Sequence, residues 1–171
     1  MHDRDYLYLL HAGVSFLRYI NKCAIVTTEI GLDGPYAISR PDIFGIDKKR
    51  STYEIEIKKS ITDFRREGKK RKNSPKNRHQ EQRVEASHKP AYFYYLVPIE
   101  IADYVNKNLP NEKVGLIVVH PDGFVHERRT AKKNKEFERP TVKQMVLMTY
   151  GITATMARIL KKLADKELRF G

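Results

Sequence analysis

The sequence predicts an α/β protein built around a mixed sheet. Two kinds of apolar spacing lead to this prediction: steps of three and four residues over 6–20 and 141–168, and strict alternation over 53–58. The first spacing is typical of amphipathic helices and the second of a strand. Because helical and extended segments alternate along the chain, we expect helices layered against a sheet.

The first part of the chain is expected to form a helix and then three strands. The helix covers 6–20, where apolar residues follow one face. Extended runs over 24–32 and 37–46 flank Asp33-Gly34-Pro35, which predicts a hairpin. Alternation over 53–58 predicts the third strand, with three apolar side chains in the core and two glutamates and a lysine on the opposite face.

A helix should follow the third strand directly. Ser60 and Asp63 have the spacing of a helix N-cap and an acid three residues later, so the helix begins here and runs toward Lys72. The remaining predicted elements are a short helix over 77–88, a strand over 91–97, a helix over 99–109, hairpin strands over 114–120 and 124–129, and a long helix over 141–168.

Length and charge narrow the class of protein. The 171 residues suit one domain, with a core over 1–120 and a carboxyl-terminal hairpin and helix over 114–171. Lys and Arg number 33 against 21 Asp and Glu, so the net charge is +12. This excess predicts a polyanionic partner, and composition alone leaves a plainly solvated charged surface as the alternative.

Cysteine usage and hydropathy point to a cytoplasmic protein. Cys23 is the only cysteine, which excludes an intrachain disulfide and a cysteine-based zinc finger. The amino-terminal residues mix acids and bases ahead of no long apolar run, so no secretory signal is expected. No segment approaches the roughly 20 apolar residues of a membrane span, and we expect no membrane association.

Two acids and a lysine form the candidate reaction site. Asp42 follows Pro41 near the middle of the second predicted strand, and Glu56 and Lys58 stand in the third. If these strands pair across the polar turn at 47–50, the three side chains meet at one edge of the sheet. Two neighbouring carboxylates repel each other, so a divalent cation between them is expected, and oxygen ligands favour Mg²⁺ or Mn²⁺.

Several short motifs accompany this site in a fixed order. They are Glu29, Arg40-Pro41-Asp42, Glu56-Ile57-Lys58-Lys59-Ser60, Asp63-Phe64, a basic stretch over 69–79, and a strand that ends in Val97-Pro98. In this order they resemble the PD-(D/E)xK nuclease superfamily, and most closely its small MmcB-like DNA repair and phage-borne nucleases. The resemblance covers about the first two thirds of the chain, and it departs from the family at Lys59 and in an insertion between residues 69 and 90.

The resemblance implies a fold, an activity and a set of roles. The fold would be a restriction-endonuclease-like αβββαβ core with a mixed central sheet, extended here by a carboxyl-terminal hairpin and a long helix. The activity would be metal-dependent endonucleolytic hydrolysis of DNA, in DNA repair or phage DNA metabolism, within a bacterial or phage-infected cell. Asp42, Glu56 and the carbonyl of Ile57 would bind Mg²⁺ or Mn²⁺, Lys58 would lie beside the attacking water, and Glu29 would be a further ligand or a base.

Other interpretations of the same residues stay open. Glu54, Glu56 and Lys58 also suit cross-strand ion pairs on a solvated face, and Glu54 is a substitute ligand if the register shifts by two. Asp42 also suits a turn, and Glu29 an exposed strand position. For the whole protein, the alternative is a non-catalytic nucleic-acid-binding protein with a nuclease-like fold. RNA as a substrate, and a homodimer that aligns two sites, also stay open.

Basic residues gather next to the candidate site. Between Lys48 and Lys89 there are fifteen Lys and Arg against six acids, a surplus of nine out of the net +12. The predicted phosphate contacts are Arg65, Arg66, Lys69, Lys70, Arg71, Lys72, Lys76 and Arg78. A second cluster over 128–135 suits either an extension of this track or an exposed loop.

Histidines and aromatic residues offer weaker signals. His120 and His126 flank a hairpin without a second type of ligand nearby, so no zinc site is expected there. The aromatic run 92–95 suits either base stacking or the core, and we favour the core.

Overall fold

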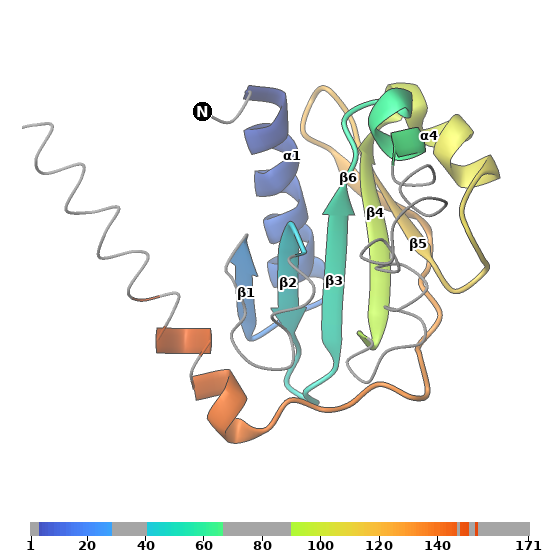
Figure 1. The fold of residues 1–171 in the computed structure, drawn as a ribbon. Coiled ribbons are helices and arrows are strands. Elements are labelled where there is room, and N and C mark those ends of the chain that lie inside the picture. Colours follow the sequence, from blue (N-terminus) through green and yellow to red (C-terminus); the bar gives the residue numbers. More distant parts are fainter. Residues whose placement is uncertain (1–3, 29–40, 67–89, 147, 151–152, 154–171) are drawn as a thin grey trace, which may run out of the picture. The chain divides into compact units, whose positions relative to one another are not determined.

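A computed structural model describes residues 4–28, 41–66, 90–146, 148–150 and 153 (Figure 1). By its internal contacts the chain divides into two compact units, Met1–Arg139 and Pro140–Gly171, which are described separately below. The predicted single domain over 1–171 stays a prediction.

The first unit contains one six-stranded mixed sheet in the order β1-β2-β3-β4-β5-β6. The strands are β1 (Ile25–Thr28), β2 (Ile43–Ile46), β3 (Thr52–Ile57), β4 (Tyr92–Pro98), β5 (Gly115–Val119) and β6 (Val125–Arg129). Strands β1, β2 and β3 pair antiparallel, β3, β4 and β5 pair parallel, and β6 returns antiparallel to β5. The predicted α/β class with a mixed sheet is therefore confirmed.

Three helical segments of this unit accompany the sheet among the described residues. Helix α1 (Arg4–Ser15) continues as the π-helical turn η1 (Phe16–Ile20), so the helix predicted over 6–20 is confirmed with a wider last turn. Helix α4 (Ile99–Lys107) ends two residues before the predicted limit. A short helix covers residues 61–66 and lies next to α4 in Figure 1.

Helices cover both faces of the sheet. One core lies between the sheet and α1, and contains Leu9, Phe16, Leu17, Ile43, Ile55, Ile57, Leu96 and Ile117. The second lies between the sheet and α4, and contains Tyr95, Val97, Ile101, Ala102, Val105, Leu116 and Val118. As a result, the polar face predicted for β3 is covered by a second layer of the protein.

The second strand begins later than predicted. Strand β2 starts at Ile43, so Asp42 lies just before the strand, and the prediction that it stands mid-strand is wrong. Pro41 gives the reason, because a proline cannot donate a backbone N–H to a sheet ladder. The predicted hairpin at Asp33-Gly34-Pro35 falls within residues 29–40, outside the described part of the chain.

Most other predicted elements of the first unit are confirmed. Strands β3, β4, β5 and β6 match their predicted ranges within one residue at each end. The N-cap at Ser60 is also confirmed, since its Oγ accepts the backbone N–H of Asp63 at 3.1 Å. The continuation of this helix toward Lys72 and the short helix over 77–88 lie outside the described residues.

The second unit is helical where it is described. Residues 142–146, 148–150 and 153 are helical, as the sequence predicts for a helix that begins at Thr141. Thr141 and Gln144 exchange two hydrogen bonds, from Gln144 N–H to Thr141 Oγ1 at 3.2 Å and from Thr141 N–H to Gln144 Oε1 at 2.7 Å. This reciprocal pair is a capping box. None of the described helices combines the length and apolar character that crossing a membrane requires.

The backbone of β5 lies too close to its neighbours to accept a side chain at Gly115. A Cβ at this position would meet the Tyr94 ring and lie 2.8 Å from the backbone nitrogen of Ala131. We expect Gly115→Ala to lower the free energy of unfolding by about 1–3 kcal/mol, because neither neighbour can move cheaply.

Gly13→Ala is the comparison, measured by urea unfolding of both variants. A Cβ at Gly13 would meet the ends of the flexible Ile43 and Leu96 side chains, and alanine favours a helix by up to about 1 kcal/mol. Gly13→Ala should therefore lower the free energy of unfolding by less than Gly115→Ala does. Wild-type stability in Gly115→Ala would contradict this packing.

Candidate active site

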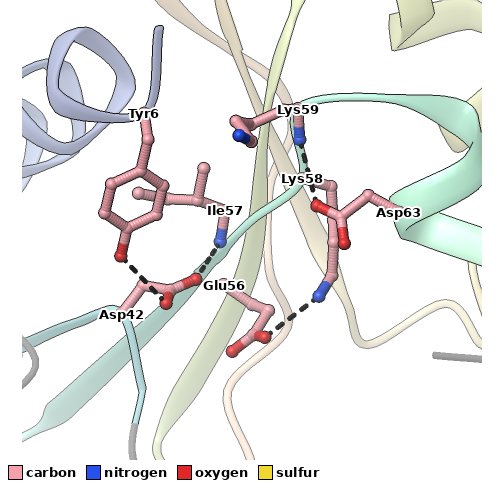
Figure 2. A network of polar contacts seen from close by, with 7 residues as sticks. All are labelled: Tyr6, Asp42, Glu56, Ile57, Lys58, Lys59 and Asp63. Atoms are coloured by element: carbon pink, nitrogen blue, oxygen red, sulfur yellow. Dashed lines mark hydrogen bonds and ion pairs between the residues drawn. The ribbon is translucent and has the colours of Figure 1, made fainter. Parts of the chain in front are cut away.

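Strand directions bring the candidate residues to one edge of the sheet. The carboxyl ends of the parallel strands β3, β4 and β5 share this edge, and the antiparallel β2 begins there. Ile43 pairs with Ile55, so the next step of the register places Asp42 opposite Glu56. Directly opposed residues carry their side chains on the same face, and the two carboxylates therefore lie side by side (Figure 2).

Asp42 is held from two elements. Its Oδ2 accepts the backbone N–H of Ile57 at 2.7 Å, and its Oδ1 accepts the hydroxyl of Tyr6 from α1 at 3.2 Å (Figure 2). One further register step would place Pro41 opposite Ile57. The Asp42 carboxylate thus accepts the N–H that a regular ladder would direct to the backbone of β2.

The Ile57 carbonyl lies on the same side as its N–H group. In an antiparallel pair the N–H and C=O of one residue face the same neighbouring strand, so this oxygen faces the start of β2. Pro41, at the opposing position, has no N–H to donate to it. The carbonyl therefore suits the ligand role predicted for Ile57.

Glu56 and Lys58 form an ion pair on the face that α4 covers. Lys58 Nζ lies 3.0 Å from Glu56 Oε1, and Lys58 is only 7% exposed. Glu54 lies on the same face and is 1% exposed. The alternative of a solvated face with surface ion pairs is therefore wrong. Removing the Glu56 carboxylate would take compensating charge from the buried ammonium group of Lys58, which is costly.

The environment of Asp42 disfavours its charged form. Burial and the nearby Glu56 carboxylate raise the pKa of Asp42 to about 6, against the opposing effects of the Ile57 N–H, Lys58 and Tyr6. A divalent cation between the carboxylates would remove their repulsion and favour both anions. The donor set therefore fits a divalent cation.

The type of ligand atom indicates which cation the site would bind. The site offers the carboxylates of Asp42 and Glu56 and the Ile57 carbonyl, and Mg²⁺ or Mn²⁺ binds few such oxygens while keeping several waters. No group of three His, Cys, Asp or Glu side chains among the described residues could hold a metal, and Glu29 lies outside them. Burial raises the pKa of Cys23 to about 12, so its thiol is no candidate ligand.

The segment after Lys58 is restrained at the same edge. Asp63 Oδ2 accepts the backbone N–H of Lys59 at 3.4 Å, while Ser60 caps the helix over 61–66 (Figure 2). Phe64 anchors this helix, with its ring 5.3 Å from that of Tyr95 and 6.4 Å from that of Tyr104. The Asp63 carboxylate thus accepts the N–H one residue before Ser60, so its predicted capping role is met in a shifted form.

The described part of the predicted phosphate track is Arg65 and Arg66, which are both exposed. Arg65 Nε donates to the hydroxyl of Tyr104 at 2.8 Å, and its guanidinium lies 5.0 Å from the centre of that ring. This contact holds Arg65 at the surface with its other donors available to a phosphate. The remaining predicted contacts lie outside the described residues: Lys69, Lys70, Arg71, Lys72, Lys76 and Arg78.

Two further observations complete the comparison with the sequence-based predictions. Tyr6 positions Asp42 across 36 residues, and the helical pattern around it carries no signal of this contact. In the aromatic run of β4, Tyr94 and Tyr95 are 3% and 1% exposed, so the core interpretation of these residues is confirmed.

Comparisons with known proteins support the fold and no activity. No protein-family model matches the sequence, and a search of curated proteins finds no match. Among solved structures, the SPO1766 protein of unknown function from Silicibacter pomeroyi is similar, with a TM-score of 0.60 and 19% identity. The match covers 98% of this chain and 96% of that one. At this identity the similarity shows a shared fold alone.

Replacing the half-buried charge of Asp42 should stabilise the protein in metal-free buffer. An acid with a raised pKa stabilises the fold below its ordinary pKa of 3.8, and this contribution is lost as the pH rises through about 6. Asp42→Asn removes the charge and keeps an amide oxygen for the Ile57 N–H. We expect it to exceed wild-type stability above pH 6, by up to about 3 kcal/mol, and to lose this advantage by pH 4.

Urea unfolding with EDTA at several pH values measures this difference. Asp103→Asn is the control, because it makes the same substitution at a side chain that is 79% exposed, where an ion pair contributes little to stability. A pH-independent difference between Asp42→Asn and wild type would contradict the assigned environment of Asp42.

Proposed function

We propose that this protein is a metal-dependent endonuclease that hydrolyses phosphodiester bonds in DNA. The observation that carries the proposal is the grouping of Asp42, Glu56 and Lys58 at one sheet edge, where the two carboxylates lie side by side and the lysine is buried. The order of the surrounding elements, helix, three strands, helix and strand, is that of the restriction-endonuclease-like core. The resemblance to PD-(D/E)xK nucleases supports the same activity.

Asp42 and Glu56 would hold Mg²⁺ or Mn²⁺ together with the Ile57 carbonyl. When bound, the cation supplies a Lewis acid for the phosphate and a water of lowered pKa. The protein's own contribution is positional, because Tyr6 and the Ile57 N–H orient Asp42 while the Lys58 ammonium group orients Glu56.

Lys58 has a second role in this proposal. Its ammonium group lies on the same face as both carboxylates, where it can donate a hydrogen bond to the attacking water or to a phosphate oxygen. A fixed positive charge in a buried site stabilises developing negative charge more than it would in water. Its burial also supports a role beyond that of a surface ion pair.

Basic residues beside the site would bind the DNA backbone. Arg65 and Arg66 stand on the helix that directly follows the site, and the chain carries a net charge of +12. Contacts of this type release counterions, so the affinity should fall steeply as salt increases and depend little on sequence.

Cleavage of plasmid and single-stranded DNA, with Mg²⁺ or EDTA, tests the proposed activity. We expect cleavage by the wild type only with the metal, and a rate about 10²–10³-fold lower in Lys58→Met, because one buried stabilising charge is removed. Lys59→Met is the matched control, since Lys59 is the neighbouring lysine but is exposed. It should keep a rate close to that of the wild type.

Thermal unfolding of each variant shows whether a lost rate reflects lost structure. Full activity in a folded Lys58→Met protein would contradict the assigned role of Lys58. A wild type that binds DNA in a salt-sensitive manner without metal-dependent cleavage would favour the alternative, a non-catalytic nucleic-acid-binding protein with this fold.

A further inference from the structure

The turn between β5 and β6 carries an exposed aromatic cluster, defined here as Tyr8, His120, Phe124 and His126. The rings of Phe124 and His126 are nearly parallel, at 21° with their centres 5.7 Å apart. The His120 ring lies 5.5 Å from that of Phe124 and 5.1 Å from that of His126. Phe124 is 59% exposed, so much of its ring contributes nothing to the protein's own core.

The aromatic cluster is held in place by hydrogen bonds. Tyr8 donates its hydroxyl to the carbonyl of His120 at 2.7 Å, and His120 N–H donates to the carbonyl of Phe124 at 2.9 Å. Asp122 Oδ1 accepts the N–H of Phe124 at 3.0 Å, and the ring nitrogens of His120 and His126 lie 3.2 Å apart. An exposed ring fixed in this way can bind a flat partner with little loss of conformational entropy.

The cluster lies at the same sheet edge as the carboxylate site. His120 directly follows the carboxyl end of β5, which lies two strands, about 10 Å, from β3. His120 also lies four residues, about 13 Å, beyond Leu116, the residue of β5 that is level with Glu56. The two sites also share a face. Glu56 pairs with Tyr95, which pairs with Leu116, and Val118, two residues further along β5, pairs with His126.

Helix α1 connects the two sites. Tyr6 donates to Asp42, and Tyr8 donates to the carbonyl of His120. Residues two positions apart on a helix point about 200° away from each other, so the two tyrosines reach toward different strands from one turn. The carboxylate site and the aromatic cluster are thus positioned by the same element.

We propose that the aromatic cluster binds an unpaired nucleobase of a single DNA strand whose backbone passes the carboxylate site. This inference rests on the proposed function and names its substrate class, a strand that is unpaired near the cut. The offsets across and along the strands together give about 16 Å, which corresponds to about five stacked nucleotides at 3.4 Å each. Exposed aromatic rings beside a basic surface are the usual elements of single-strand binding, because every base offers a flat face for stacking.

Charge complementarity favours a nucleic-acid strand over an apolar partner. Strand β6, which follows Phe124, carries Arg129 as well as Arg128, which is paired with Asp103 at 2.6 Å, and the whole chain has a net charge of +12. A stacked base would cover the exposed Phe124 ring while the phosphates of its strand meet a protein of net positive charge. An apolar protein surface would use the ring and would not complement the net positive charge of the chain.

Equilibrium binding of a labelled single-stranded oligonucleotide in EDTA tests this inference without cleavage. We expect Phe124→Ala to bind about ten-fold more weakly than the wild type, and Phe124→Tyr, which keeps the ring, to bind nearly as well. A duplex of the same sequence should bind both proteins almost equally. Tyr19→Ala is the matched control, because Tyr19 is 77% exposed at the other end of the first helix and should not affect binding.

Each outcome separates the subsite from the nuclease. Unchanged single-strand affinity in a folded Phe124→Ala protein would overturn the subsite, whether or not the wild type cleaves DNA. An equal loss of affinity for the duplex would also overturn it. So would a Phe124→Ala protein that keeps its oligonucleotide affinity but no longer self-associates in sedimentation velocity. Phe124-dependent binding by a wild type that never cleaves would support the subsite and contradict the proposed function.

Discussion

The register between β2 and β3 is the constraint on which the rest of the site depends. It places Asp42 opposite Glu56, and a further step would place Pro41 opposite Ile57. Since proline donates no backbone hydrogen bond, the ladder ends there, and the Asp42 side chain accepts the Ile57 N–H instead. One sheet edge thereby acquires two adjacent carboxylates and the Ile57 carbonyl, to which Pro41 has no N–H to donate. A shift of one residue would turn the carboxylates onto opposite faces.

The helices on the two faces of the sheet partly exclude water from the charged groups at this edge. Helix α1 covers one face and supplies Tyr6 to Asp42, while α4 packs on the other face, on which the largely buried Glu56–Lys58 pair lies. Burial weakens screening by water, so the charges interact strongly, and the raised pKa of Asp42 is one consequence. The arrangement costs stability in the metal-free protein. Such a cost is typical of residues whose placement serves binding or chemistry.

Local sequence patterns predict the helices and strands well. The candidate site is harder to predict, because the contacts that shape it join residues distant in sequence. Alternation along β3 correctly separated Ile55 and Ile57 from Glu56 and Lys58. The same pattern suits a solvated face, because no local signal shows that α4, more than forty residues later, covers that side. The apolar residues after Asp42 predict a mid-strand position for it, and this pattern is stronger than the single signal from Pro41. The contacts of Tyr6 and Tyr8 span 36 and 112 residues, so spacing alone does not reveal them.

Anomalous scattering from a crystal soaked in Mn²⁺ is the most direct test of the central claim, that Asp42 and Glu56 together bind a divalent cation. The account predicts one peak within about 2.0–2.4 Å of an oxygen from each carboxylate, with the Ile57 carbonyl as a further ligand. Glu56 and Asp42 should also bind the ion when Lys58 is replaced by methionine. Ordered carboxylates without a peak between them, or Mn²⁺ bound only elsewhere, such as at His120 and His126, would contradict it.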